Sequence, residues 1–137
     1  MKAPFLLDTC ACLWLLSNEL SSSSLVALAD AFNNGIRTYV SPITALEVGT
    51  LARNRRFRSH LSPQKWFETI LSQPGMALAG MPAELLMESA LLPGEIQADP
   101  YDRIIAATAR AYSYTVLTRD GGLLDYARHG YLSALKC

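Results

Sequence analysis

The sequence predicts an α/β protein in which a mainly parallel sheet lies between two layers of helices. Short apolar runs alternate along the chain with longer segments that carry helix start and stop signals. Strands separated by helices in this way are typical of parallel sheets. No internal repeat or linker divides the 137 residues, so we expect a single domain over residues 1–137.

In the first half of the chain, the pattern predicts two strands and the helices between and after them. An apolar run at residues 5–7 is expected to be a buried strand, and residues 11–16 are compatible with a helix. A serine cluster offers N-caps for a helix at about residues 21–33. A second strand is expected at residues 37–40, and a Ser-Pro pair then opens a helix at about residues 43–53.

The second half repeats these signals. The pair Ser62-Pro63 opens a helix that ends before Pro74, and a short strand is expected at residues 76–79. Further helices are expected at residues 82–91 and 101–112, followed by strands at residues 115–118 and 131–135. Apolar side chains at helical spacing are expected in the core, among them Trp14, Trp66, Phe67 and Ile70.

Composition excludes several classes of protein. Half of the residues are hydrophobic and 18% are charged, as in a compact globular protein. The formal net charge is zero, so binding to nucleic acid would need a local basic patch. Three cysteines, of which Cys10 and Cys12 are too close for an easy disulfide, favour a reducing cytoplasm and disfavour a thiolate metal site. No apolar run is long enough to indicate secretion or a membrane span.

Two aspartates lie just past apolar strands: Asp8 directly follows the first, and Asp120 comes after Thr118-Arg119 at the end of the strand at residues 115–118. Ligands of open parallel sheets bind outside the carboxyl ends of the strands, so these carboxylates can reach one ion if their strands are neighbours. Such hard oxygen ligands suit Mg²⁺ or Mn²⁺ better than zinc. The alternative is that each aspartate only caps the helix that follows it.

Two further acids, Asp102 and Glu47, are candidates for the same site. Asp102 lies in the first turn of the helix at 101–112, for which Asp99 is explained as the N-cap. That helix is apolar or small almost all round, so we expect it to be central, with its first turn beside the strand ends. Glu47 has apolar neighbours in sequence, and a buried carboxylate is costly unless it has a partner such as a metal ion.

One dense basic run follows the helix that carries Glu47. It can contact the phosphates of RNA, or it can be a solvated helix end that the helix dipole favours. Arg103 and Arg119 stand beside acidic positions, where they can balance charge or contact a substrate. The residues of the basic run are Arg53, Arg55, Arg56, Arg58 and His60.

Four segments of the chain resemble the PIN domain family and, within it, the VapC-type toxins of bacterial toxin–antitoxin pairs. They occur in the family's order and span nearly the entire chain, which makes chance similarity a poor explanation. The segments are LLDT at residues 6–9, SPITALEVG at 41–49, DPYDRIIAATA at 99–109 and TRD at 118–120.

This resemblance implies a five-stranded parallel sheet between helices and an endoribonuclease that depends on Mg²⁺ or Mn²⁺ and inhibits translation. One or two ions would activate a water for in-line attack on a phosphodiester. The resemblance also implies a homodimer and a VapB-type antitoxin that lays a segment across the active-site groove. The family's four acidic positions are matched here by Asp8, Glu47, Asp102 and Asp120. Thr118 matches a hydroxyl residue that helps to hold the water shell of the metal. Asp99 matches an extra acid that is less constant in the family. Cys10 departs from the His or Asn that is common after the first motif.

Two alternatives from other classes remain open from the sequence. A phosphoacceptor receiver domain is also a small parallel α/β protein that binds Mg²⁺, but it predicts paired acids after the first strand and a lysine after a late strand. Here Asp8 is followed by Thr9, and Lys136 is the one lysine after Lys65. A non-catalytic α/β binding module is the other alternative, and the presence of all four acids argues against it.

Overall fold

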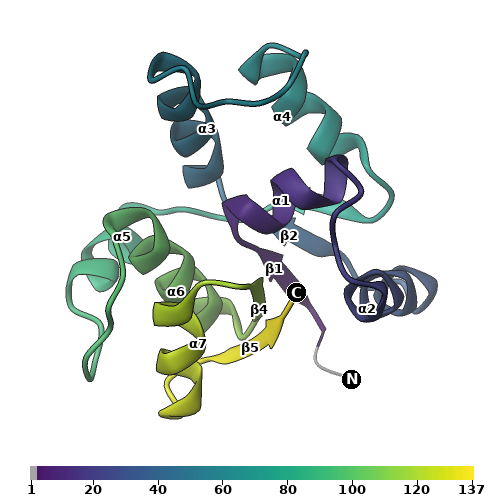
Figure 1. Cartoon of the computed structure of the whole chain (residues 1–137). Coiled ribbons are helices and arrows are strands. Elements are labelled where there is room, and N and C mark those ends of the chain that lie inside the picture. The colour runs from purple at the N-terminus through teal and green to yellow at the C-terminus, as the bar shows by residue number, and fades with distance from the viewer. Residues whose placement is uncertain (1–2) are drawn as a thin grey trace.

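The computed structural model of the chain describes residues 3–137. Within them, helices and strands alternate as the sequence predicted, and the strands form one five-stranded, all-parallel sheet (Figure 1). The elements, in chain order, are β1 Phe5–Leu7, α1 Thr9–Leu16, α2 Ser22–Asn33, β2 Thr38–Val40, α3 Ile43–Arg53, α4 Pro63–Ser72, β3 Met76–Leu78, α5 Ala83–Ala90, α6 Pro100–Tyr112, β4 Thr115–Thr118, α7 Gly121–Arg128 and β5 Ser133–Lys136.

The strand order β3-β2-β1-β4-β5 places the first and fourth strands side by side at the centre of the sheet. Their register pairs Leu6 with Val116 and Leu7 with Leu117. The chain first builds outward from β1 to β3 and then returns to β4 on the other side of β1, so the order reverses between these two strands. In open α/β sheets such a switch point leaves a crevice at the carboxyl ends of the strands, where ligands bind. The residues that follow β1 and β4 therefore flank the expected ligand site.

Helices cover both faces of the sheet, which confirms the predicted three-layer α/β/α architecture. Side chains alternate across a strand, so β1 sends Phe5 and Leu7 to one face and Leu6 to the other. On the first face they pack with buried residues of α1, α2, α3 and α4, including Trp66. On the second face they pack mainly with α6 and α7, including Ile105.

Most predicted elements are confirmed to within one or two residues, and three details differ. The last strand begins at Ser133, two residues later than predicted. α3 begins at Ile43 as predicted, but its N-cap is Pro42 and not Ser41, whose hydroxyl accepts a hydrogen bond from the Ile43 N–H at 3.1 Å. α7, which the sequence did not single out, begins with Gly121 and Gly122, and glycine is a poor helix former.

The four apolar side chains expected in the core all belong to it or pack against it. Trp66 and Ile70 are buried as predicted, whereas Trp14 and Phe67 are partly buried and pack against the same cluster. Across residues 3–137, no helix combines the length and the apolar character that a bilayer span requires.

Candidate active site

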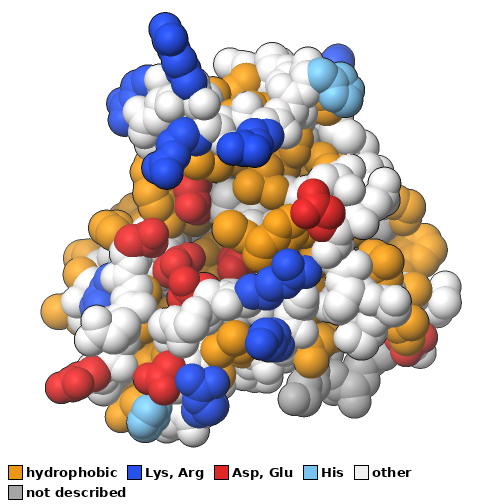
Figure 2. All heavy atoms as spheres, viewed as in Figure 1, with side chains coloured by type: hydrophobic (Ala, Val, Ile, Leu, Met, Phe, Trp, Pro, Cys, Tyr) orange, Lys and Arg blue, Asp and Glu red, His pale blue; other side chains and the backbone are white. Residues whose placement is uncertain are grey.

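A pocket of about 320 Å³ opens at the carboxyl ends of β1 and β4. Figure 2 shows acidic side chains gathered around a hollow on this face of the molecule, with basic side chains above and beside them. The pocket contains every acid that the sequence proposed, drawn from four separate stretches of the chain. It is lined by Asp8, Thr9, Cys10, Trp14, Glu47, Asp99, Asp102, Arg119 and Asp120.

Asp8 is held rigidly at the base of this pocket. It follows β1 directly, is 4% exposed, and caps α1 by accepting a hydrogen bond from the Ala11 N–H at 2.8 Å. Its other carboxylate oxygen accepts a hydrogen bond from the Thr118 hydroxyl at 2.5 Å. Burial raises the pKa of Asp8, and the charge of Asp120 raises it further, while the two hydrogen bonds act in the opposite direction.

Thr118 also fixes Asp120, the acid at the end of β4. The fully buried Thr118 hydroxyl accepts a hydrogen bond from the Asp120 N–H at 2.9 Å. The Asp120 carboxylate in turn caps α7 by accepting from the Leu123 N–H at 2.9 Å. Both strand-end aspartates therefore cap a helix and line the pocket, so the capping explanation and the active-site explanation are compatible.

Glu47 reaches the pocket from α3 and is half-buried. Burial raises its pKa, and the charges of Asp99 and Asp8 add to the effect, whereas the Thr9 hydroxyl lowers it. Glu47 has apolar neighbours in sequence, but one of them, Leu46, is 57% exposed and does not enclose the carboxylate. The partner of Glu47 is the polar side chain of Thr9. The Thr9 hydroxyl is itself 3.0 Å from the buried hydroxyl of Thr44.

Asp102 enters from the first turn of α6, whose N-cap is Asp99 as predicted. The Asp99 carboxylate accepts a hydrogen bond from the Asp102 N–H at 2.9 Å and remains exposed. Burial, together with the charges of Asp99, Asp120, Asp8 and Glu47, raises the pKa of Asp102 to about 7. This carboxyl is thus close to half-protonated at neutral pH.

The donor set of this pocket fits a hard divalent cation by its chemistry. Carboxylate oxygens are the preferred ligands of Mg²⁺ and Mn²⁺. Burial is the main cause of the raised pKa of Asp102, and the charges of Asp99, Asp120, Asp8 and Glu47 raise it further, so a bound cation would relieve repulsion among these carboxylates. Over residues 3–137, no three His, Cys, Asp or Glu side chains yet converge closely enough to hold one ion. Mg²⁺ usually keeps several of its waters and binds through one or two carboxylates, so an ion can be held here partly through its water shell.

Cys10, which departs from the family's common His or Asn, is exposed and lines the pocket. Burial of the sulfur and the surrounding carboxylates, Asp8 first among them, raise the pKa of its thiol to about 11. Cys12 and Cys137 are buried, and all three thiols are free.

The basic run after α3 lies on the surface beside this pocket. Arg53 is in the last turn of α3, as the helix dipole favours, and Arg55, Arg56 and Arg58 are exposed in the segment that follows. Three members of the run, Arg56, Arg58 and His60, line a groove of about 590 Å³ with Trp14, which also lines the acidic pocket.

The two arginines next to acidic positions have different surroundings. Arg103 donates hydrogen bonds to the carbonyls of Ser89 and Ala90, so it ties α6 to the end of α5. Arg119 lines the acidic pocket, with its guanidinium carbon 3.9 Å from the ring centroid of Trp14. The place of Trp14 in the pocket was missed by sequence reasoning, since an aromatic residue at helical spacing is more often core.

Comparison with known proteins agrees with this architecture. The family model described as PIN domain matches residues 5–129. Among solved structures, VapBC2 from Rickettsia felis, bound to a DNA fragment from its promoter, superposes with a TM-score of 0.68 at 18% identity, over 96% of each chain. FitAcB from Neisseria gonorrhoeae superposes with a TM-score of 0.55 at 21% identity, again over 96% of each chain.

A structure of FitAB bound to an IR36 DNA fragment superposes with a TM-score of 0.52 at 21% identity, over 96% of this chain and 93% of that one. No curated protein sequence matches. The receiver-like alternative is not supported, because Lys136 is exposed at the end of β5 and does not line the acidic pocket. Because the family model covers most of the chain, this protein belongs to the PIN domain family.

Proposed function

We propose that this protein is a metal-dependent endoribonuclease and the toxin of a toxin–antitoxin pair that acts in the cytoplasm by cleaving RNA and so inhibits translation. The observation that carries the proposal is the convergence of Asp8, Glu47, Asp102 and Asp120 on one pocket at the switch point of the sheet. PIN domains are generally nucleases, which supports this reading of the pocket.

Mg²⁺ or Mn²⁺, when bound, supplies an activated water and positive charge for the transition state of phosphodiester cleavage. In the proposed site Asp8, Asp102 and Asp120 would hold the cation, and Glu47 would either join them or orient the attacking water. Thr118 positions two of these acids through its hydrogen bonds. Asp99 supports Asp102 as an additional acid, since its carboxylate accepts from the backbone at that residue.

The basic run provides the proposed contact to the RNA backbone. Phosphates repel an acidic pocket, so a substrate needs cations close by to be held there. Exposed arginines border the groove that meets the acidic pocket at Trp14. An RNA strand bound in the pocket can therefore continue across the surface along this groove. The proposed contacts are Arg53, Arg55, Arg56 and Arg58.

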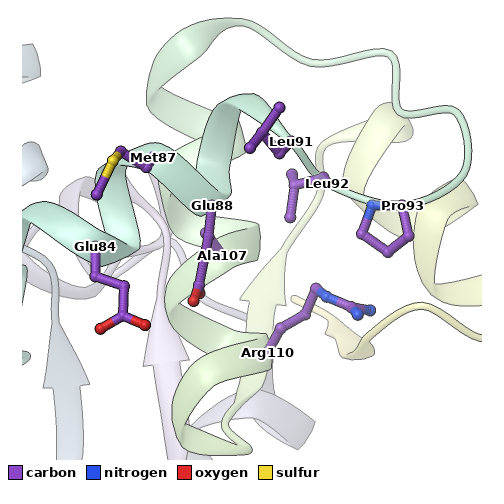
Figure 3. Close-up of a pocket in the computed structure, with 8 residues that line it drawn as sticks. All are labelled: Glu84, Met87, Glu88, Leu91, Leu92, Pro93, Ala107 and Arg110. Atoms are coloured by element: carbon purple, nitrogen blue, oxygen red, sulfur yellow. The ribbon is translucent and has the colours of Figure 1, made fainter.

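The likeness to VapBC2 and FitAB supports an antitoxin partner of the VapB type for this chain. Exposed apolar side chains support a homodimer as well. Met87 on α5 and Leu91, the C-cap of α5, are 62% and 80% exposed, and they border a pocket beside α5 and α6 (Figure 3). None of the four acids of the candidate active site lines this second pocket. A second copy of the chain can therefore cover it without blocking the active site.

The test is incubation of purified protein with total RNA, with and without Mg²⁺ or Mn²⁺, beside the variant Asp8→Asn. Asparagine retains a side-chain oxygen that can cap α1, so the variant is expected to fold but to lose cleavage. Asp125→Asn is the matched control, because Asp125 lies on α7, outside the acidic pocket. Cleavage by Asp8→Asn at the wild-type rate, with metal present, would refute the assignment.

A further inference from the structure

The guanidinium of Arg119 lies over the ring of Trp14 at the mouth of the acidic pocket. The guanidinium carbon is 3.9 Å from the ring centroid, and Arg119 is exposed to solvent. Its plane is fixed by two further hydrogen bonds, which it donates to the carbonyl of Cys137 at 2.7 Å and to that of Glu19 at 3.1 Å. A long, flexible side chain is thereby held in one orientation at the surface.

Trp14 is the wall shared by two surfaces of opposite charge. On one side it lines the pocket that contains the four acids, and on the other it lines the groove that contains Arg56 and Arg58. A nucleic-acid strand that runs from the acids to these arginines must therefore pass over Trp14 and the guanidinium that covers it.

We propose that Trp14 and Arg119 form a stacking platform that binds one unpaired base of the RNA beside the cleaved phosphate. This inference rests on the proposed ribonuclease function and assigns to Trp14 and Arg119 the binding of one base of its substrate. Unstacked bases bind to aromatic rings and to arginine guanidinium planes, and the indole beneath Arg119 supports that plane from below. A base in a duplex has its faces covered by its neighbours and cannot use such a platform.

The same contacts also suggest a merely structural role for Arg119. Its bonds to the carbonyls of Glu19 and Cys137 tie the turn between α1 and α2 to the residue after β5. The two roles differ in what they predict for RNA. A structural role affects all RNA sequences equally, whereas a platform makes binding depend on the presence of a base at one position along the strand.

The experiment uses the full chain and a set of short single-stranded RNAs that share one cleavage site, with each RNA lacking a single base. KM and kcat are measured with Mg²⁺ or Mn²⁺ for wild type, for Arg119→Lys and for Trp14→Leu. With wild type, removal of the base at one position next to the cleaved phosphate is expected to raise KM about tenfold. With Arg119→Lys, which keeps the charge but lacks the planar group, the same removal is expected to change KM less than twofold.

Arg128→Lys is the matched control, because Arg128 is exposed on α7 and pairs with Asp125 outside both surfaces. It should show the wild-type dependence on the missing base. Should Trp14→Leu fail to fold by circular dichroism, Arg119→Lys alone decides the outcome.

Two failures are distinguishable. Cleavage that shows the same dependence on the missing base in wild type and Arg119→Lys overturns the platform, while the ribonuclease function stands. Absence of cleavage of every RNA by wild type overturns the proposed function itself, and the platform with it.

Discussion

The Thr118 hydroxyl donates a hydrogen bond to the Asp8 carboxylate at 2.5 Å, across the junction of the two central strands. The same oxygen accepts a hydrogen bond from the Asp120 N–H. One buried hydroxyl therefore sets the relative position of two acids that lie more than a hundred residues apart in sequence.

Thr118→Val removes this hydroxyl and leaves the Asp8 carboxylate and the Asp120 N–H without their partner. The variant should therefore lose about 1–3 kcal/mol of unfolding free energy at pH 7, measured by urea denaturation. The hydrogen bond lowers the pKa of Asp8, so its loss raises that pKa and shifts the acidic limb of the pH–rate profile to higher pH. Thr118→Ser, which keeps the hydroxyl, should retain the wild-type limb. An unshifted limb in Thr118→Val would show that Asp8 is not tuned through this contact.

Asp102 should make the metal-free protein less stable as the pH rises. Its pKa is raised to about 7 in the folded state, whereas an unfolded aspartate titrates near 3.8. Between these values the folded state binds more protons than the unfolded state, so stability falls with rising pH, and the loss is complete above about pH 7. The expected loss is about 1–2 kcal/mol, allowing for solvent screening at this partly exposed group.

Asp102→Asn should remove this pH dependence and stabilise the metal-free protein at pH 8. Thermal unfolding in EDTA at pH 4.5, 6 and 8 measures the effect. Addition of Mg²⁺ at pH 8 should raise the melting temperature of wild type more than that of the variant, because the ion supplies the missing positive charge. Equal slopes for wild type and variant between pH 4.5 and 8 would contradict the assignment of the uncompensated charge to Asp102.

The sequence predicted the elements of this fold well wherever the signals were local. Asp99-Pro100 opens α6 as expected, and the acids after β1 and β4 were recognised from the apolar strands before them. The sequence did not predict that β1 and β4 are neighbours, because local patterns carry no information about the order of strands in the sheet. Exposure was the weaker point, since Cys10 and Trp14 owe their places in the pocket to tertiary packing.

The α7 helix was missed because its first two residues are glycines, and Gly122 has a tertiary reason to be one. A Cβ at this position would lie 1.8 Å from the backbone oxygen of Gln97, so Gly122→Ala must push α7 away from that segment. We expect a loss of about 1–3 kcal/mol of stability in urea denaturation. Cleavage should fall as well, because Asp120 caps the displaced helix.

Gly121→Ala is the internal control for this substitution. A Cβ at Gly121 meets nothing within 4 Å, and alanine is the better helix former, so stability should stay equal or rise slightly. A similar loss in both variants would mean that the helix start, and not the close approach to Gln97, sets the requirement for glycine.

The groove lined by Arg56, Arg58 and His60 should contribute to RNA binding through its positive charge. Neutralising Arg56 and Arg58 in a double glutamine variant removes two phosphate contacts, so the affinity for RNA should fall and the salt dependence should flatten by about 1.4 in the slope of log K against log salt concentration. Fluorescence anisotropy in EDTA, where no cleavage occurs, measures both. Lys65→Gln, on the exposed surface of α4, is the control, and a salt slope equal to that of wild type in the double variant would remove these arginines from the RNA path.

Cys10 offers a way to detect cation binding without measuring cleavage. Partial burial of the sulfur and the nearby carboxylates raise its thiol pKa from the usual 9.0 to about 11, so its thiolate fraction at pH 8 is about 100-fold smaller than that of an ordinary exposed cysteine. Alkylation by iodoacetamide should therefore be slow although the side chain is exposed. Mg²⁺ bound among the carboxylates offsets the charges that raise this pKa, so the ion should accelerate alkylation, whereas Na⁺ at equal ionic strength should not. Cys12 and Cys137 are buried, so loss of alkylation in Cys10→Ser identifies Cys10 as the reacting residue. If Asp8 and Asp120 hold the ion, the double variant Asp8→Asn and Asp120→Asn should abolish the acceleration by Mg²⁺.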